Sequence, residues 1–228
     1  MKIHGLQKLT LLDYPGKVAC TVFLGGCNFR CPFCHNFQIV DGTEPPIMDG
    51  EELIKFLSKR QGLLEGVCVT GGEPLLRADI AELLREIKAL GFSVKLDTNG
   101  SKPALLKQLV KDGLVDYVAM DIKSSLSNYA EITGVTTDIS AINESVQFLL
   151  SDAVDYEFRT TVIDKYHNDV VMSDIAKWIK GAKRYYIQPF VDRDTVPERE
   201  LCAPSKEALK RYAAIVSGSV KQVEIRAE

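Results

Sequence analysis

Residues 18–34 read VACTVFLGGCNFRCPFC, an apolar run that passes directly into a loop with three cysteines. The run 18–24 is rich in β-branched and aromatic residues, which is typical of a buried β-strand. Cys27, Cys31 and Cys34 follow it with the spacing Cys-x-x-x-Cys-x-x-Cys. Three thiolates can hold three corners of a cuboidal iron–sulfur cluster and leave the fourth iron open to a ligand that is not protein. The stretch therefore predicts a strand that ends in a metal site.

A structural zinc site is the main alternative use of these cysteines. His35 follows Cys34, so a Cys3His site is chemically feasible. Such sites usually take a second ligand pair from another knuckle, and the sequence contains no further Cys-x-x-Cys or His-x-x-x-His pair. A disulfide framework is disfavoured because six cysteines in 228 residues are not dense and no signal segment precedes them. Cys20, Cys68 and Cys202 are not assigned to the metal.

Length and composition limit the class of protein. With 228 residues, 46% apolar and 26% charged, the chain is expected to form a single α/β domain over residues 1–228. The sequence has no apolar stretch near the ~20 residues that cross a bilayer, and its first residues carry no targeting pattern. We therefore expect a soluble, cytoplasmic protein without a membrane partner. The net charge of −3, without a block of Lys or Arg, does not favour nucleic-acid binding.

Short apolar runs alternate along the chain with segments of helical period, which indicates repeated βα units around a parallel sheet. The strands are expected at 18–24, 66–70, 93–97, 116–121, 156–163 and 184–189, with an extra C-terminal edge strand at 220–226. Apolar residues recur three and four apart in the segments 53–57, 80–90, 105–109, 142–149, 171–179 and 209–216. Gly91 and Gly113 stand where two helices should end. Six consecutive units predict a partial (β/α)6 barrel.

Polar motifs follow several of the expected strands at their carboxyl ends. They are Gly71-Gly72-Glu73-Pro74 after the second strand, Asp97-Thr98-Asn99-Gly100 at the third, Asp121-Ile122-Lys123 at the fourth, and Arg159 with Thr161 in the fifth. Taken singly, each has an ordinary explanation as a turn, a helix start or a surface ion pair. Their shared position changes this interpretation, because the βα loops of a parallel sheet emerge on one face and collect functional groups there.

The residue types at this face suggest what it could bind. Paired glycines allow the backbone to approach a ligand that a β-carbon would repel, and Glu73 lies close in sequence to receive a ligand ammonium group. Asp97 and Asp121 would lie close together if the third and fourth strands are neighbours, and two carboxylates at one edge invite either a cation or an intervening lysine such as Lys123. Both options remain open at this point.

The chain resembles the radical S-adenosylmethionine (SAM) superfamily, whose cysteine motif it matches with Phe33 at the aromatic place. Within the superfamily, Cys34-His35-Asn36, Leu96-Asp97-Thr98-Asn99-Gly100 and Met120-Asp121-Ile122-Lys123 are similar to the glycyl-radical-enzyme activating group. Residues 13–17 (DYPGK) and 26–36 (GCNFRCPFCHN) most resemble the activating proteins of anaerobic ribonucleoside-triphosphate reductase. The resemblance covers nearly the whole chain.

This resemblance implies a set of cofactor contacts. Cys27, Cys31 and Cys34 would ligate one [4Fe-4S] cluster, whose open iron would chelate the amino and carboxylate groups of SAM. The SAM-binding residues would be Gly71, Gly72 and Glu73 at the methionine amino end, with Asp97, Asn99, Lys123 and Arg159 along the remainder. In pyruvate formate-lyase activators, the equivalents of Asp97 and Asp121 help to bind a monovalent cation. Those activators also have a histidine shortly after the proline of the sixth strand, where this chain instead reads Pro189-Phe190-Val191.

The resemblance also implies a reaction. Flavodoxin or ferredoxin would reduce the cluster, SAM would be cleaved to methionine and a 5′-deoxyadenosyl radical, and this radical would abstract a glycine hydrogen from a partner glycyl-radical enzyme. No catalytic residue beyond the cluster is required. Two alternatives remain: a radical SAM enzyme for a small molecule, such as a carboxy-deazaguanine synthase, and a non-catalytic zinc-binding module. The polar segment 192–200 is expected to be a solvated loop rather than a partner contact.

Overall fold

The computed structural model describes residues 1–226, and the chain falls into two compact units. The first unit comprises Met1–Asn28, Asn36–Thr98 and Lys102–Val118. The second comprises Phe29–His35, Asn99–Ser101 and the chain from Ala119 onward. The cysteine loop therefore contributes residues to both units. The expectation of a single domain stays a prediction.

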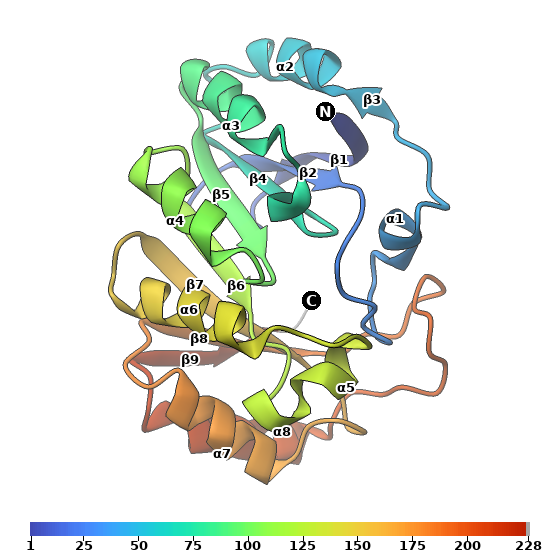
Figure 1. Ribbon diagram of the computed structural model, residues 1–228, viewed down its shortest axis with the longest axis vertical. Coiled ribbons are helices and arrows are strands. Elements are labelled where there is room, and N and C mark those ends of the chain that lie inside the picture. Colours follow the sequence, from blue (N-terminus) through green and yellow to red (C-terminus); the bar gives the residue numbers. More distant parts are fainter. Residues whose placement is uncertain (227–228) are drawn as a thin grey trace. The chain divides into compact units, whose positions relative to one another are not determined.

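The first unit carries most of the strands (Figure 1). They are β1 (Lys2–Thr10), β2 (Ala19–Leu24), β3 (Met48–Asp49), β4 (Gly66–Gly71), β5 (Ser93–Thr98) and the first residues of β6 (Tyr117–Asp121). Their order is β3-β1-β2-β4-β5-β6. β2, β4 and β5 are parallel, as predicted for the buried apolar runs, and β1 is antiparallel to β2. The parallel arrangement brings the carboxyl ends of β2, β4 and β5 to one edge of this unit.

β1 and β3 were not among the expected strands, and the reason is visible in β1. Only Ile3 and Thr10 of this strand are buried, so the sequence has no alternation of apolar and polar residues to signal it. Two register shifts in its pairing with β2 disturb the alternation further. β3 covers the outer edge of β1 only at Lys2 and Ile3, so the described remainder of that edge carries no β3 partner.

The helices of the first unit are α1 (Phe37–Asp41), α2 (Gly50–Ser58), α3 (Ile80–Ala89) and α4 (Pro103–Lys111), with a short 3-10 helix η1 (Pro74–Leu76). The predicted apolar faces of α2, α3 and α4 are confirmed, since Leu53, Leu83 and Leu106 are fully or almost fully buried. Gly91 and Gly113 adopt φ values of +88° and +68°, the left-handed conformation expected where these helices end. The five-residue helix α1 was not predicted because it is too short to show a helical period.

The second unit contains the rest of β6, then β7 (Asp155–Val162), β8 (Arg184–Pro189) and β9 (Gln222–Ile225), in the order β6-β7-β8-β9. Its helices are η2 (Leu126–Asn128), α5 (Tyr129–Thr133), α6 (Ile139–Leu150), α7 (Asp169–Trp178) and α8 (Lys206–Ser217). β9 pairs in parallel with β8 and confirms the predicted C-terminal edge strand. Within residues 1–226, the strand order ends at β3 and β9, so the mostly parallel sheet is open and the α/β class is confirmed.

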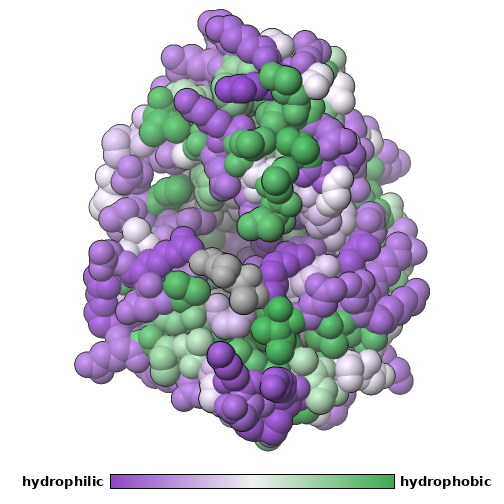
Figure 2. Space-filling model, turned by 180° about the vertical axis from the view of Figure 1, so that it is seen from behind, coloured by the Kyte–Doolittle hydropathy of each residue, from purple (hydrophilic) through white to green (hydrophobic). Residues whose placement is uncertain are grey.

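The surface carries both polar and apolar side chains. Figure 2 shows one face on which hydrophilic residues predominate and hydrophobic groups appear between them. The most exposed large apolar side chains include Leu11 and Leu12, in the turn between β1 and β2. None of the helices in the described part of the chain combines the length and the apolar character that spanning a bilayer requires.

Candidate cofactor site

The three motif cysteines are available as thiols. None of the six cysteines forms a disulfide; Cys31 is buried, whereas Cys27 and Cys34 are half-buried. Cys27 belongs to the first unit, and the other two motif cysteines belong to the second. Within neither unit do three or more His, Cys, Asp or Glu side chains of residues 1–226 gather at metal-binding distance. The ligand role of the three cysteines stays a prediction.

In the second unit, backbone contacts fix the cysteine loop from two sides. The Arg30 amide donates a hydrogen bond to the carbonyl of Thr133 at the end of α5, at 2.8 Å. Gly134 follows with φ of +66°, and a β-carbon there would press against the Arg30 carbonyl, so a side chain is disfavoured. On the other side, the Glu198 amide donates to the Pro32 carbonyl at 3.0 Å. These contacts set the backbone that carries Cys31 and Cys34.

His35 uses its ring for packing and for a backbone contact. Its Nε2 lies 2.6 Å from the Val191 carbonyl oxygen, so this nitrogen donates. The ring stacks on Phe190, with centroids 5.6 Å apart and an interplanar angle of 15°. The zinc alternative requires this histidine as the fourth ligand, and the contact engages one of its two ligand nitrogens. A histidine that binds a metal through one ring nitrogen commonly donates the other to a carbonyl, so this contact is compatible with the zinc site as well as with a loop that has three protein ligands.

The segment after β8 is a mostly exposed loop, as expected, and it also contacts the cysteine loop. Thr195 donates its hydroxyl to the His35 carbonyl at 2.7 Å, in addition to the backbone contact of Glu198. The Glu198 carboxylate pairs with Lys165 and accepts a hydrogen bond from the Tyr166 hydroxyl at 2.7 Å. These contacts were not predicted because individual hydrogen bonds leave no trace in residue composition. The segment supports the cysteine loop.

The Gly71-Gly72 pair lies against the chain's own backbone. Gly71 has a φ of +121°, and β-carbons at both glycines would overlap backbone atoms of Leu24 and Gly26. The Gly72 amide donates to the Leu24 carbonyl, and the Glu73 amide donates to the Gly26 carbonyl, each at 2.8 Å. From the sequence alone, this close approach was expected to serve a ligand. In the structure it joins the end of β4 to the turn after β2, where the cysteine loop begins.

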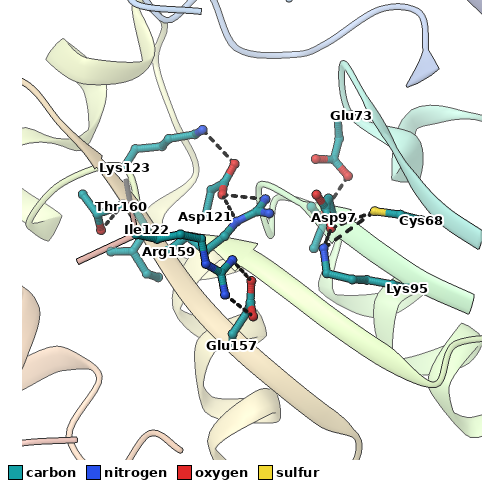
Figure 3. Close-up of polar contacts among 12 residues, drawn as sticks. Cys68, Glu73, Lys95, Asp97, Asp121, Ile122, Lys123, Glu157, Arg159 and Thr160 are labelled. Carbon is teal, nitrogen blue, oxygen red and sulfur yellow. Dashed lines mark hydrogen bonds and ion pairs between the residues drawn. The ribbon is translucent and has the colours of Figure 1, made fainter. Parts of the chain in front are cut away.

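Glu73 links the ends of two strands in the first unit. Its side chain is buried, with 1% exposed. Its Oε1 accepts hydrogen bonds from the Leu75 amide at 3.1 Å and from the Thr98 hydroxyl at 2.8 Å. Figure 3 shows the carboxylate pointing toward the end of β5. Two hydrogen bonds to one oxygen of this buried carboxylate fix its orientation.

Lys95 forms a buried cluster with Asp97 that the sequence reasoning missed (Figure 3). The two side chains are 1% and 13% exposed and form an ion pair. Cys68, from β4, lies with its Sγ 3.7 Å from the Lys95 Nζ and 3.6 Å from the Asp97 Oδ1. A signal was present, because residues two apart on a strand share a face. The lysine was overlooked because it precedes the motif at the strand end.

Asp121, Lys123 and Arg159 form a second cluster of charges, in the second unit (Figure 3). Lys123 Nζ lies 3.0 Å from Asp121 Oδ2, and Arg159 Nη2 lies 2.9 Å from Asp121 Oδ1. Burial alone would raise the pKa of Asp121, but the Arg159 and Lys123 cations outweigh it and lower that pKa to about 2. The carboxylate is therefore ionised at neutral pH, and it orients both cations.

The pKa of Lys123 also depends on the cysteines of its own unit. Burial disfavours its charged form, yet the Asp121 carboxylate raises the pKa of Lys123 above its usual value, with further contributions from Cys31 and Cys34. Behind it, His167 donates from Nε2 to the Lys123 carbonyl at 3.1 Å. The structure thus brings Lys123, Arg159 and two of the motif cysteines into one electrostatic environment.

Two buried hydroxyls support the fit of a polar cofactor. The Oγ atoms of Ser101 and Ser124 are buried without a hydrogen-bond partner among the described residues. These serines come directly after Asn99-Gly100 and after Lys123. A buried hydroxyl without a partner costs roughly 1–3 kcal/mol, which a polar ligand could offset. Thiols for a cluster, fixed charges and unused hydroxyls fit a cluster with SAM. Sequence reasoning missed both serines because a lone serine carries no signal.

Comparison with known proteins identifies the family. The sequence pattern described as the Radical SAM superfamily matches residues 21–179. A protein of Methanocaldococcus jannaschii named "Putative glycyl-radical enzyme activating enzyme" is 33% identical over 98% of this chain and 95% of its own length. A pyruvate formate-lyase-activating enzyme of Listeria monocytogenes is 33% identical over 54% of this chain and 53% of its own length. A 7-carboxy-7-deazaguanine synthase of Hyperthermus butylicus is 29% identical over 91% of this chain and 80% of its own length.

Solved structures agree on the fold. SuiB of Streptococcus suis superposes with a TM-score of 0.69 at 13% identity, over 91% of this chain and 48% of that chain. A domain of pyruvate-formate lyase-activating enzyme from Bacteroides vulgatus gives a TM-score of 0.56 at 15% identity, over 70% of this chain and 98% of that chain. The family pattern over residues 21–179 and the relative matched over 98% of this chain show that the chain belongs to the radical SAM superfamily and, within it, to the glycyl-radical-enzyme activating enzymes.

Proposed function

We propose that this enzyme uses one [4Fe-4S] cluster, held by Cys27, Cys31 and Cys34, to cleave SAM and to generate a glycyl radical on a partner protein. We propose anaerobic ribonucleoside-triphosphate reductase as that partner. The observation that carries the activase function is the match to a glycyl-radical enzyme activating enzyme over 98% of this chain. The choice of partner rests on the resemblance of residues 13–17 and 26–36 to the activators of that reductase.

When bound, the reduced cluster would supply the electron that cleaves SAM to methionine and a 5′-deoxyadenosyl radical. The residues of the chain would then bind and orient the reactants, because this chemistry needs positioning rather than a general base. Glu73 would receive the SAM ammonium group, since its buried carboxylate is held in one orientation. Lys123 and Arg159 would face the anionic parts of SAM, with Asp121 fixing both cations. Gly71, Gly72, Asp97 and Asn99 would complete the pocket.

Several partners complete the proposal. Flavodoxin or ferredoxin would deliver the electron, and the protein would act in the cytoplasm as a single radical SAM domain. Asp97 and Asp121, the two carboxylates that could bind a monovalent cation, both already have cationic side chains as neighbours. Neither a nucleic acid nor a membrane is needed for the reaction.

The test is anaerobic reconstitution with iron and sulfide, followed by reduction with SAM and a candidate glycyl-radical enzyme. We expect about four irons per chain and a protein-borne glycyl signal by electron paramagnetic resonance. Cys34→Ser should lose the cluster and the signal. Cys202→Ser, at an exposed cysteine outside the motif, is the matched control and should keep both. A colourless, zinc-loaded protein that leaves SAM intact would instead support the zinc module.

A small-molecule enzyme is the second candidate, and the likeness to 7-carboxy-7-deazaguanine synthase over 91% of this chain favours it. Both candidates cleave SAM, so cleavage alone does not separate them. The reduced enzyme should be given the substrate of that synthase in one vessel and the candidate reductase in another. Product formation in the first vessel, without a glycyl signal in the second, would replace the activase proposal.

A further inference from the structure

We propose that Lys95 is a positioning residue that supplies, from the chain itself, the positive charge beside Asp97, so that the site works without an inorganic monovalent cation. This inference rests on the proposed binding of SAM by Asp97. It concerns a side chain outside the predicted cofactor contacts. It also chooses between the two options that the sequence left open for Asp97 and Asp121.

The placement of Lys95 follows from the strands of the first unit. Lys95 pairs in register with Cys68 of β4, and Asp97 lies two residues further along β5 on the same face. The ammonium group forms an ion pair with the Asp97 Oδ1, while the Cys68 Sγ lies 3.7 Å from the Nζ. The lysine side chain is 99% buried, so this arrangement is not a surface ion pair that solvent would screen.

Burial makes the ion pair between Lys95 and Asp97 important for stability. An ammonium group removed from water is costly unless a carboxylate compensates it, and breaking such a pair leaves an uncompensated buried charge. Asp97 therefore already has a counter-charge of +1 next to Oδ1. An alkali cation bound to the same oxygen would be repelled by the neighbouring ammonium group. We therefore expect either Lys95 or an inorganic cation next to the Asp97 carboxylate, but not both.

The second carboxylate, that of Asp121, is also paired with cationic side chains of its own unit. Asp121 contacts Lys123 on one oxygen and Arg159 on the other. Two cations for one carboxylate leave no net negative charge to attract a further cation. Both acidic side chains that could bind a cation are therefore neutralised by residues of this chain. Lys95 is the member of this set that touches Asp97, and it would fix the orientation of that carboxylate toward SAM.

The experiment compares cation dependence in the wild type and in Lys95→Met, which keeps the length and removes the charge. SAM cleavage by the reconstituted enzyme is measured with tetramethylammonium, K⁺ or Na⁺ as the buffer cation at equal ionic strength. The wild type should change by less than about twofold between buffers. Lys95→Met should lose about tenfold or more in tetramethylammonium and recover in K⁺ or Na⁺. Lys55→Met, at a 73% exposed lysine of α2, is the control and should behave as the wild type.

A second readout needs neither cluster nor SAM. The melting temperature of the apoprotein is measured in the same buffers, because a cation that binds the folded state raises it. Only Lys95→Met should gain stability from K⁺ or Na⁺. If Lys95→Met does not fold, the double variant Lys95→Met with Asp97→Asn removes both charges, and its melting temperature should not respond to the cation.

The outcomes separate this inference from the proposed function. A wild type whose SAM cleavage or melting temperature depends strongly on K⁺ or Na⁺ overturns the role of Lys95 and leaves the activase proposal intact. A Lys95→Met variant that loses activity without recovery in any salt also overturns it. A wild type that never cleaves SAM overturns the proposed function, and the apoprotein measurement still decides the role of Lys95.

Discussion

At the scale of single residues, the site includes a position, Gly72, at which only glycine fits. The backbone at Gly72 approaches Gly26 so closely that a β-carbon would overlap its carbonyl oxygen. This contact, rather than flexibility, explains the glycine. The cysteine spacing and the Asp121–Lys123 motif could be found from the sequence because their members are close along the chain. The Cys68–Lys95 contact could not, because it depends on the register of β4 against β5.

We therefore expect Gly72→Ala to lower the free energy of unfolding by about 3 kcal/mol or more, because backbone atoms cannot yield as a side chain would. The measurement is the urea midpoint of the apoprotein under reducing conditions. Gly218→Ala is the matched control, since its φ of −74° is ordinary and its β-carbon would meet open space. Equal midpoints for the two variants would show that the end of β4 can move away from the turn after β2.

At the scale of elements, the connections after β7 and β8 help to hold the site, in addition to the end of α5. The segment after β8 holds the cysteine loop, and His167, after β7, holds the carbonyl of Lys123. The apolar strands and helices could be predicted because burial imposes a period on their residues. These connections could not, because backbone hydrogen bonds determine them and residue composition does not. β1 escaped prediction for a related reason, since few of its side chains are buried.

His167, in the connection after β7, makes the free energy of unfolding depend on pH. Burial lowers the pKa of His167 below its usual value, and its Nδ1 accepts from the Ile163 amide at 3.1 Å. The unfolded chain therefore binds a proton more readily than the folded one. The stabilisation is full above pH ~6.5 and is lost as pH falls toward the lower folded pKa, with a slope of at most ~1.4 kcal/mol per pH unit. Urea unfolding of the apoprotein at several pH values between 8 and 5 measures this slope.

Two variants isolate this effect. His167→Gln should flatten the slope below pH ~6.5, because the titrating ring is gone. Tyr212→Phe removes the hydroxyl that donates to the His167 carbonyl at 2.7 Å but leaves the ring in place. It should cost about 1 kcal/mol at every pH and keep the wild-type slope. A His167→Gln protein with an unchanged slope would assign the pH dependence to other groups.

At the scale of the molecule, the sequence predicts one domain, while the contacts group into two compact units. β6 contributes to both, with Tyr117 and Val118 in the first and the residues from Ala119 in the second. A strand shared in this way favours joint unfolding of the units. The α/β class followed from the alternation of strands and helices, whereas this grouping depends on contacts between residues far apart in sequence.

The single tryptophan can test this expectation. Trp178 lies in the second unit, where its Nε1 donates to Asn143 at 2.9 Å and its ring meets Tyr129 edge to face. Its fluorescence reports that unit, whereas far-ultraviolet circular dichroism reports the helices of both. The two signals should give one coincident urea transition. Separate midpoints would mean that the units unfold independently.

The outer edge of β1, which β3 covers only at Lys2 and Ile3, has a consequence for handling the protein. A strand with free amides and carbonyls is a template on which a neighbouring molecule can pair and start an aggregate. Lys8 projects an exposed charge from this strand, close to the exposed Leu9. The charge of Lys8 is expected to oppose such pairing. Surface redesign for concentrated anaerobic samples should therefore keep Lys8 and replace Leu9.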